Sequence, residues 1–142
     1  PLELFGCVHR AFTLTPPVHA YLELLRAVDR ERFAVHLDPV NIVSSPRRYY
    51  SNAEVISRCV RLLGGHIRSC HAKDVLLRPG ALVHLDEVRP GEGNLDYAAY
   101  LRALDALDAD TPLMLEHLSS ADEYAAAADY IRSVAAREGV GL

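Results

Sequence analysis

The sequence predicts an α/β fold in which four strands each lead into a helix and the strands form a parallel sheet. Strand-like apolar runs alternate with segments of helical periodicity along the chain, which is typical of βαβ units. Each strand-like run carries a metal-binding type of side chain at or near its end: Glu3, Asp38, His71 and Glu116. Parallel strands of a (β/α) barrel open their carboxyl ends on one face, where the active site lies. These four side chains are therefore expected to converge.

Local sequence signals place eight elements. Apolar residues recur at helical spacing, Asn52 is a candidate N-cap, and Ser120 with Glu123 matches a capping box. The expected elements are strand 2–6, helix 18–28, strand 33–38, helix 53–63, strand 66–72, helix 96–107, strand 112–118 and helix 120–137. Residues 39–51 and 73–95 are expected to be loops, and a connection as long as the second one is usually functional or mobile.

The composition excludes several classes of function. A net charge of −4 and a pI near 6.0 leave no electrostatic footprint for nucleic acid. No apolar run reaches the roughly 18 residues that a membrane span needs, so we expect no membrane association. The cysteines number 3 and have unrelated spacings, which indicates reduced thiols and a cytoplasmic protein.

The 142 residues are expected to form a single domain, residues 1–142, with four βα units that amount to half of an eight-unit barrel. An isolated half barrel leaves two sheet edges and one flank of its core exposed. The sequence therefore predicts either self-association or a missing N-terminal half. An open four-stranded α/β sheet is the alternative, although it would spread the four candidate ligands apart.

The candidate ligands differ in the strength of their signal. Glu116 lies in an otherwise apolar run, where a carboxylate has to be paired or bound to a metal. Asp38 precedes a proline, so it is either a ligand or a simple strand-ending residue. His71 precedes Lys73 and Asp74, and such a polar cluster favours a site over a structural histidine. Two Glu, one Asp and one His form a hard site suited to Mn, Mg, Co or Zn.

Two further segments leave alternatives open. The Gly-rich stretch at residues 87–97 matches no phosphate-binding motif, so it is either a helix-entry loop or a segment that presents Glu87 and Arg89 to a polyhydroxy substrate. The basic and aromatic residues 47–50 are interpreted as a solvated loop that packs its tyrosines, in preference to a nucleic-acid patch. His36 lies two residues before Asp38, on the same side of the strand, where it lines the pocket or supports Asp38.

The motifs LELF, HLDPVN, HAKD, RPGEGNLDY and LEHL occur in this order along the chain. With them, the chain resembles the second half of the xylose isomerase-like TIM-barrel superfamily over nearly its whole length. That group includes sugar (phosphate) isomerases and epimerases, inosose dehydratases, hydroxypyruvate isomerases and apurinic endonucleases. The resemblance implies a partial TIM barrel that corresponds to strands 5–8 of a (β/α)8 barrel. The nuclease branch has a histidine where this chain has Asn41, which argues against DNA repair.

The resemblance also implies a function and a set of roles. It implies a divalent-metal-dependent isomerase or epimerase that removes a proton next to the carbonyl of a sugar or polyol-derived substrate. One metal ion would be held by Glu3, Asp38, His71 and Glu116, with Mn preferred over Mg, Co or Zn. The two glutamates would also be the acid–base pair. Substrate contacts are expected from His36, Asn41, Lys73, Glu87 and Arg89. An inosose dehydratase-type lyase and an inactive half barrel are the alternatives.

Overall fold

The computed structural model describes the backbone of residues 3–4 and the whole of residues 18–142. The strands are β1 (Glu3–Leu4), β2 (Phe33–Leu37), β3 (Ile67–Ala72), β4 (Asp74–Arg78), β5 (His84–Val88) and β6 (Leu113–Leu115). The helices are α1 (Val18–Val28), α2 (Pro39–Ile42), α3 (Pro46–Tyr50), α4 (Asn52–Leu63), α5 (Tyr97–Leu104) and α6 (Ala121–Glu138), with a 3-10 turn at Gly64–His66.

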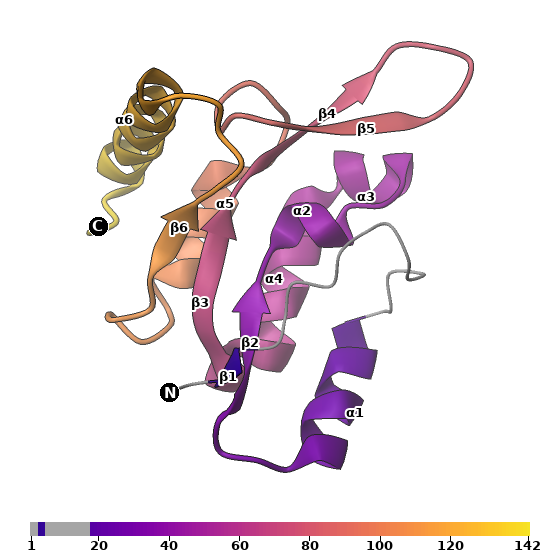
Figure 1. Ribbon diagram of the computed structural model, residues 1–142, viewed down its shortest axis with the longest axis vertical. Helices are drawn as coiled ribbons and strands as arrows, with labels where there is room; N and C mark the ends of the chain where they lie inside the picture. Colours follow the sequence, from indigo (N-terminus) through magenta and orange to yellow (C-terminus); the bar gives the residue numbers. More distant parts are fainter. Residues whose placement is uncertain (1–2, 5–17) are drawn as a thin grey trace.

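Four of the strands form one parallel sheet in the order β1-β2-β3-β6 (Figure 1). The register aligns Leu37 of β2 with Cys70 of β3, and Ala72 of β3 with Leu115 of β6. The carboxyl ends of these three strands therefore lie at nearly the same height. The predicted α/β fold, with its parallel sheet and without a closed barrel, is confirmed.

The helices cover one side of this sheet and create the hydrophobic core there. Figure 1 shows α4 and α5 behind the strands, with α1 and α6 at the two flanks. The amphipathic pattern of α4 puts Ile56, Cys59 and Leu63 into the core, and α5 contributes Tyr100 and Leu101. None of these five side chains is more than 2% exposed. Burial of this kind contributes about 25 cal/mol for each Å² of apolar surface, so these contacts fix α4 and α5 on the sheet.

The loop predicted for residues 73–95 is wrong in its first part, where the structure has a β-hairpin. Strands β4 and β5 pair antiparallel from Asp74 opposite Val88 to Arg78 opposite His84. The hairpin extends away from the carboxyl ends of the parallel strands (Figure 1). Its ladder satisfies backbone groups that a long irregular loop would have to leave to water.

The loop predicted for residues 39–51 is also wrong, because α2 and α3 lie within it. Each of these short helices has a proline in its first turn and a side-chain N-cap: Asp38 accepts hydrogen bonds at the start of α2, and Ser45 at the start of α3. Tyr49 is buried and Tyr50 is exposed. The packing interpretation of this segment therefore holds for Tyr49.

The remaining predicted elements are present with shifted ends. Helix α1 has the predicted bounds, and α6 begins directly after Ser120, whose hydroxyl accepts a hydrogen bond from the backbone N–H of Glu123 at 3.3 Å. Helix α5 ends at Leu104, earlier than predicted. Strand β6 ends at Leu115, so Glu116 follows the strand and does not lie inside it. Of the helices at residues 18–142, none has both the length and the apolar character needed to cross a bilayer.

The buried carboxylate of Asp74 fixes the turn that follows the hairpin. It accepts hydrogen bonds from the backbone N–H groups of Val75 at 2.8 Å, Gly91 at 3.0 Å, Gly93 at 3.1 Å and Leu95 at 2.8 Å. Burial raises the pKa of Asp74, while these four donors act in the opposite direction because they favour the carboxylate. Asp74 thus joins the end of β3 to the glycine-rich turn.

The two glycines of this turn are required by space and backbone conformation. Gly91 has a φ of +95°, and a Cβ on it would lie 2.8 Å from the Tyr130 ring. A Cβ on Gly93 would lie 2.3 Å from a carboxylate oxygen of Asp74 and 2.5 Å from the carbonyl oxygen of Val75. The glycine-rich stretch is therefore a tightly packed entry to α5, and its backbone closes over Asp74.

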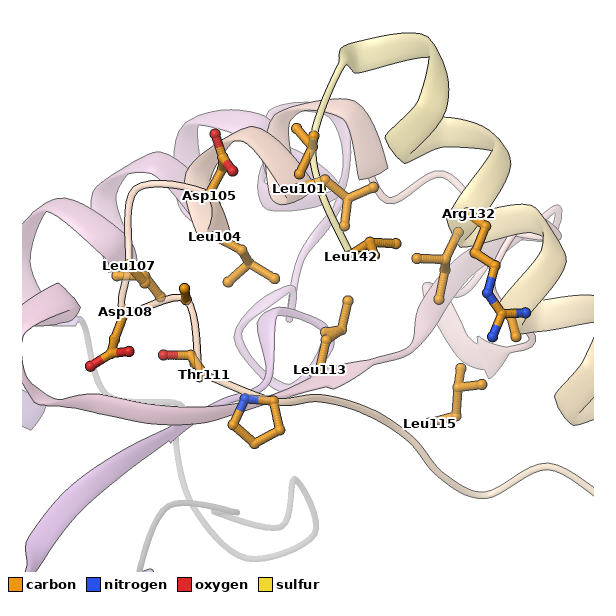
Figure 2. A pocket seen from close by; sticks show the side chains of 16 residues that line it. Leu101, Leu104, Asp105, Leu107, Asp108, Thr111, Leu113, Leu115, Arg132 and Leu142 are labelled. Atoms are coloured by element: carbon orange, nitrogen blue, oxygen red, sulfur yellow. The ribbon is translucent and has the colours of Figure 1, made fainter.

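An apolar groove of about 880 Å³ lies beside β6, between α5 and α6. Figure 2 shows leucines from several elements pointing into it, among them Leu104, Leu113 and Leu142. Among the described residues, β6 pairs with β3 alone, so its other edge is unpaired. The groove and the open edge lie at the same flank of the sheet.

Candidate metal centre

Asp38, His71 and Glu116 converge at the carboxyl ends of three adjacent strands. One ligand atom from each lies within 4.8 Å of the other two. His71 Nδ1 is 2.9 Å from Glu116 Oε1 and 3.4 Å from Asp38 Oδ2. Because β2, β3 and β6 are in register, residues far apart in the sequence reach a common point. The structure thus brings together three of the four ligands predicted from the sequence.

Asp38 is held rigidly at the junction between β2 and α2. Its Oδ1 accepts hydrogen bonds from the backbone N–H groups of Val40 at 3.0 Å and Asn41 at 3.3 Å. Its Oδ2 accepts one from Asn41 Nδ2 at 3.0 Å and also faces His71. One carboxylate oxygen therefore caps a helix, and the other is oriented toward the cluster. Asn41, predicted to contact substrate, supports Asp38 here.

Lys73 occupies the centre of this group of carboxylates. Its side chain is only 3% exposed, and Nζ lies 3.1 Å from Asp38 Oδ2 and 3.4 Å from Glu87 Oε2, with a still closer contact to Glu116. Burial alone would lower the pKa of Lys73, but the carboxylates of Glu116, Asp38 and Glu87 together raise it above its usual value. Lys73 is therefore a fixed cation within the cluster.

The charge of Glu116 depends on the same contacts. Burial acts to raise the pKa of Glu116, but its hydrogen bond and charge interaction with Lys73, helped by His71 and His117, outweigh this and lower the pKa. Glu116 is consequently ionised near neutral pH. An ionised carboxylate can bind a metal cation and can accept a proton.

Sequence reasoning missed His117. It is one of two described non-glycine residues with a positive φ, at +60°. His117 Nδ1 is 2.9 Å from Glu87 Oε1, and its Nε2 is 3.6 Å from Glu116 Oε2. Non-glycine residues in this conformation are enriched at functional sites. The LEHL motif contains the residue, but nothing in the sequence reveals the backbone conformation.

His36 lies beside His71 on the neighbouring strand. The two rings meet edge to face with their centroids 3.9 Å apart, and His36 Nδ1 is 2.5 Å from Ser69 Oγ. Desolvation by burial, with a smaller contribution from His71, lowers the pKa of His36. A neutral His36 supports the His71 ring without adding positive charge to the cluster.

The other predicted residues lie differently. Glu87 reaches the cluster through Lys73 and His117. Arg89 does not reach it and instead forms ion pairs with Glu92 and Glu123. The backbone of Glu3 pairs with Phe33 at the start of β2, while its side chain lies outside the described residues. A fourth ligand from Glu3 therefore stays a prediction.

The donor atoms of the cluster fit a divalent metal ion. His71 Nδ1 is buried and forms no hydrogen bond of acceptable geometry, although it lies 2.9 Å from Glu116 Oε1, an oxygen that also contacts Lys73. A buried polar atom without a hydrogen bond is costly, and a metal cation that accepts the lone pair of His71 Nδ1 would remove that cost. One imidazole nitrogen and two carboxylates are donors suited to Mn, Mg, Co or Zn.

The comparisons with known proteins agree with this fold. Residues 13–134 match the protein family described as "Xylose isomerase-like TIM barrel". No curated protein matches the sequence. The crystal structure of a xylose isomerase domain protein from Planctomyces limnophilus superposes with a TM-score of 0.69 at 22% identity, over 96% of this chain and 46% of that one. The chain therefore belongs to the xylose isomerase-like TIM-barrel family.

A second solved structure, the IOLI protein with a binding zinc atom, matches with a TM-score of 0.50 and 25% identity. The match covers 85% of this chain and 41% of that protein. The chain thus spans less than half the length of the solved structures it matches, and it corresponds to a partial barrel.

Proposed function

We propose that this chain forms the metal-binding part of a barrel that isomerises or epimerises a small sugar by removing a proton next to its carbonyl group. The observation that carries the proposal is the convergence of Asp38, His71 and Glu116 at one end of the parallel sheet. Family membership and the zinc atom of the IOLI structure support a metal-dependent reaction on this scaffold.

The metal would be held by Asp38, His71 and Glu116, with Glu3 as the fourth ligand implied by the family resemblance. Bound there, a divalent ion would polarise the carbonyl and make the neighbouring C–H more acidic. We propose Mn as the ion, with Mg, Co and Zn as alternatives. The buried, ordered position of Asp38 supports a fixed coordination geometry.

The proton transfer would be carried by the chain's own carboxylates. Glu116 is ionised and is proposed to accept the proton, and Glu3 is proposed to return it to the opposite face or to the adjacent carbon. Lys73 would stabilise the negative charge that develops on the substrate oxygen, because its ammonium group lies beside Glu116 and away from water. General acid–base help of this kind contributes roughly 10²–10⁴-fold.

The test of this function has two measurements. Titration of Mn²⁺ into the chain, followed by calorimetry, is expected to show one saturable site that His71→Ala removes. His66→Ala is the matched control, because His66 lies in the 3-10 turn before β3, at the opposite end of that strand from His71. In the complete barrel, a sugar substrate in D₂O is expected to take up deuterium next to its carbonyl. Absence of both Mn²⁺ binding and exchange would reject the function.

We also propose that the open edge of β6 and its apolar groove are covered in the working protein, either by the N-terminal half of a barrel or by a second copy of the chain. An unpaired edge beside a groove of about 880 Å³ favours such an association. Analytical ultracentrifugation of the chain alone is expected to show self-association. A monomer that persists at high concentration would count against this proposal.

A further inference from the structure

We infer that the hollow beside the metal centre receives an uncharged, hydroxyl-bearing end of the substrate and does not accept a phosphate group. This inference rests on the proposed function, because it names the class of substrate for that site. The hollow has a volume of about 300 Å³ and lies between the end of β5, the glycine-rich turn and the start of α6. Its polar lining residues are Glu87, Arg89, Glu92, His117, Ser119 and Glu123.

The hollow adjoins the metal centre. Glu87 and His117 line it and also contact the cluster, since Glu87 lies 3.4 Å from Lys73 and His117 lies 3.6 Å from Glu116. A chain of a few carbon atoms bound at the metal centre by its carbonyl end could therefore extend into this space. The chemistry of its walls then decides which end group fits.

The single guanidinium in the hollow is already neutralised. Arg89 Nη2 donates a hydrogen bond to Glu92 Oε1 at 2.8 Å, and Arg89 Nε, which is buried and forms no hydrogen bond of acceptable geometry, lies within ion-pair distance of Glu123 Oε2 at 3.0 Å. With Glu87, the lining contains three carboxylates and one arginine, together with His117. A phosphate dianion would have to displace two carboxylates from Arg89 and then remain beside them. This is the opposite of a phosphate pocket, in which unpaired donors face the anion.

The start of α6 is closed to anions in the same way. Helix N-termini attract anions through free backbone N–H groups and the helix dipole. In α6, Ser120 accepts a hydrogen bond from the N–H of Glu123 at 3.3 Å, and both Asp122 and Glu123 lie in the first turn. The chain's own negative charges therefore already occupy this end of the helix.

Hydroxyl groups suit the same walls. Carboxylates are pure acceptors, while each hydroxyl of a polyol can donate one hydrogen bond and accept others from Arg89 or His117. Glu92 and Glu123 are 51% and 40% exposed, so their carboxylate oxygens are accessible to hydroxyl donors. The substrate class that follows is an unphosphorylated sugar or polyol derivative.

The first experiment uses inorganic phosphate as the probe and is independent of turnover. Phosphate is titrated into the purified protein and its ³¹P signal is followed. The wild type is expected to show no saturable binding below about 10 mM, whereas Glu92→Gln with Glu123→Gln should bind at least about tenfold more tightly, because Arg89 is released. The control Glu23→Gln with Glu54→Gln makes the same charge change at exposed positions on other helices. It should behave like the wild type.

Binding of phosphate by the wild type below about 1 mM, lost in Arg89→Gln, would overturn the inference.

The second experiment compares deuterium uptake by ketoses and by the matching ketose phosphates in the complete barrel. Free ketoses are expected to exchange at least about tenfold faster. Faster exchange of the phosphates would reject the substrate class while leaving the proposed function intact. If neither the ketoses nor the ketose phosphates exchange, while the wild type still fails to bind phosphate, the proposed function is rejected. The conclusion that the hollow does not accept phosphate then still stands.

Discussion

Replacing Glu116 by Gln is expected to lower proton exchange at the substrate carbon by at least about a hundredfold. Glutamine preserves the size of the side chain but neither accepts the proton nor carries a negative charge. In the structure Glu116 is ionised and lies 2.9 Å from His71, and the proposed function gives it both the ligand and the base role. Deuterium incorporation measured by NMR in the complete barrel reports the loss directly.

The same variant separates three roles of Glu116. If it is ligand and base, Mn²⁺ affinity falls and excess Mn²⁺ does not restore exchange. Rescue of turnover by added metal would mean that Glu116 is a ligand only. Normal exchange at ordinary metal concentration would reject the acid–base role altogether. Glu54→Gln, an exposed charge change on α4, is the matched control and should change neither quantity.

Replacing Asp74 by Ala is expected to lower the free energy of unfolding by about 3 kcal/mol or more. The change leaves four buried or partly buried backbone N–H groups without their acceptor and releases the turn from the end of β3. Urea denaturation followed by circular dichroism measures the difference.

Asp96→Ala is the matched control for this change. Asp96 is exposed and accepts one hydrogen bond, from Ala99 at 2.8 Å, as the N-cap of α5. Loss of such a cap costs typically about 1 kcal/mol. Equal destabilisation by the two substitutions would show that Asp74 is no more than an ordinary cap and that the turn does not depend on it.

The parts of the fold that could be predicted from sequence are those with strong local signals. Helix α1 has apolar residues at helical spacing, and α6 has a serine cap at its start. The convergence of Asp38 and Glu116 was also predictable, because both follow strands of one parallel sheet. Strand order and register then bring them together without any information about side-chain packing.

The parts that could not be predicted depend on long-range pairing or on backbone conformation. The β4–β5 hairpin has no clear alternation of apolar and polar residues and is recognisable only through its cross-strand pairs. Lys73 was expected at the site, but its ion pairs with three carboxylates from other segments depend on contacts that the sequence does not reveal. Likewise, the contact of His117 with Glu87 depends on a positive φ that no residue type at that position indicates. The ion pair of Arg89 with Glu123 was not predictable either, because the two residues lie far apart along the chain.

Changes of sequence at the tip of the β4–β5 hairpin do not reach the cluster around Lys73, because the two strands stay paired at the base of the hairpin. Lys73 directly precedes the hairpin and Glu87 lies in its last pair but one, where Val75 faces Glu87. Beyond the pair Arg78–His84, extra or missing residues would change only the exposed tip, which carries Leu82 and Val83. The tip is thus a position where evolution or a protein engineer can graft new segments above the carboxyl ends of the strands while Lys73 and Glu87 keep their places.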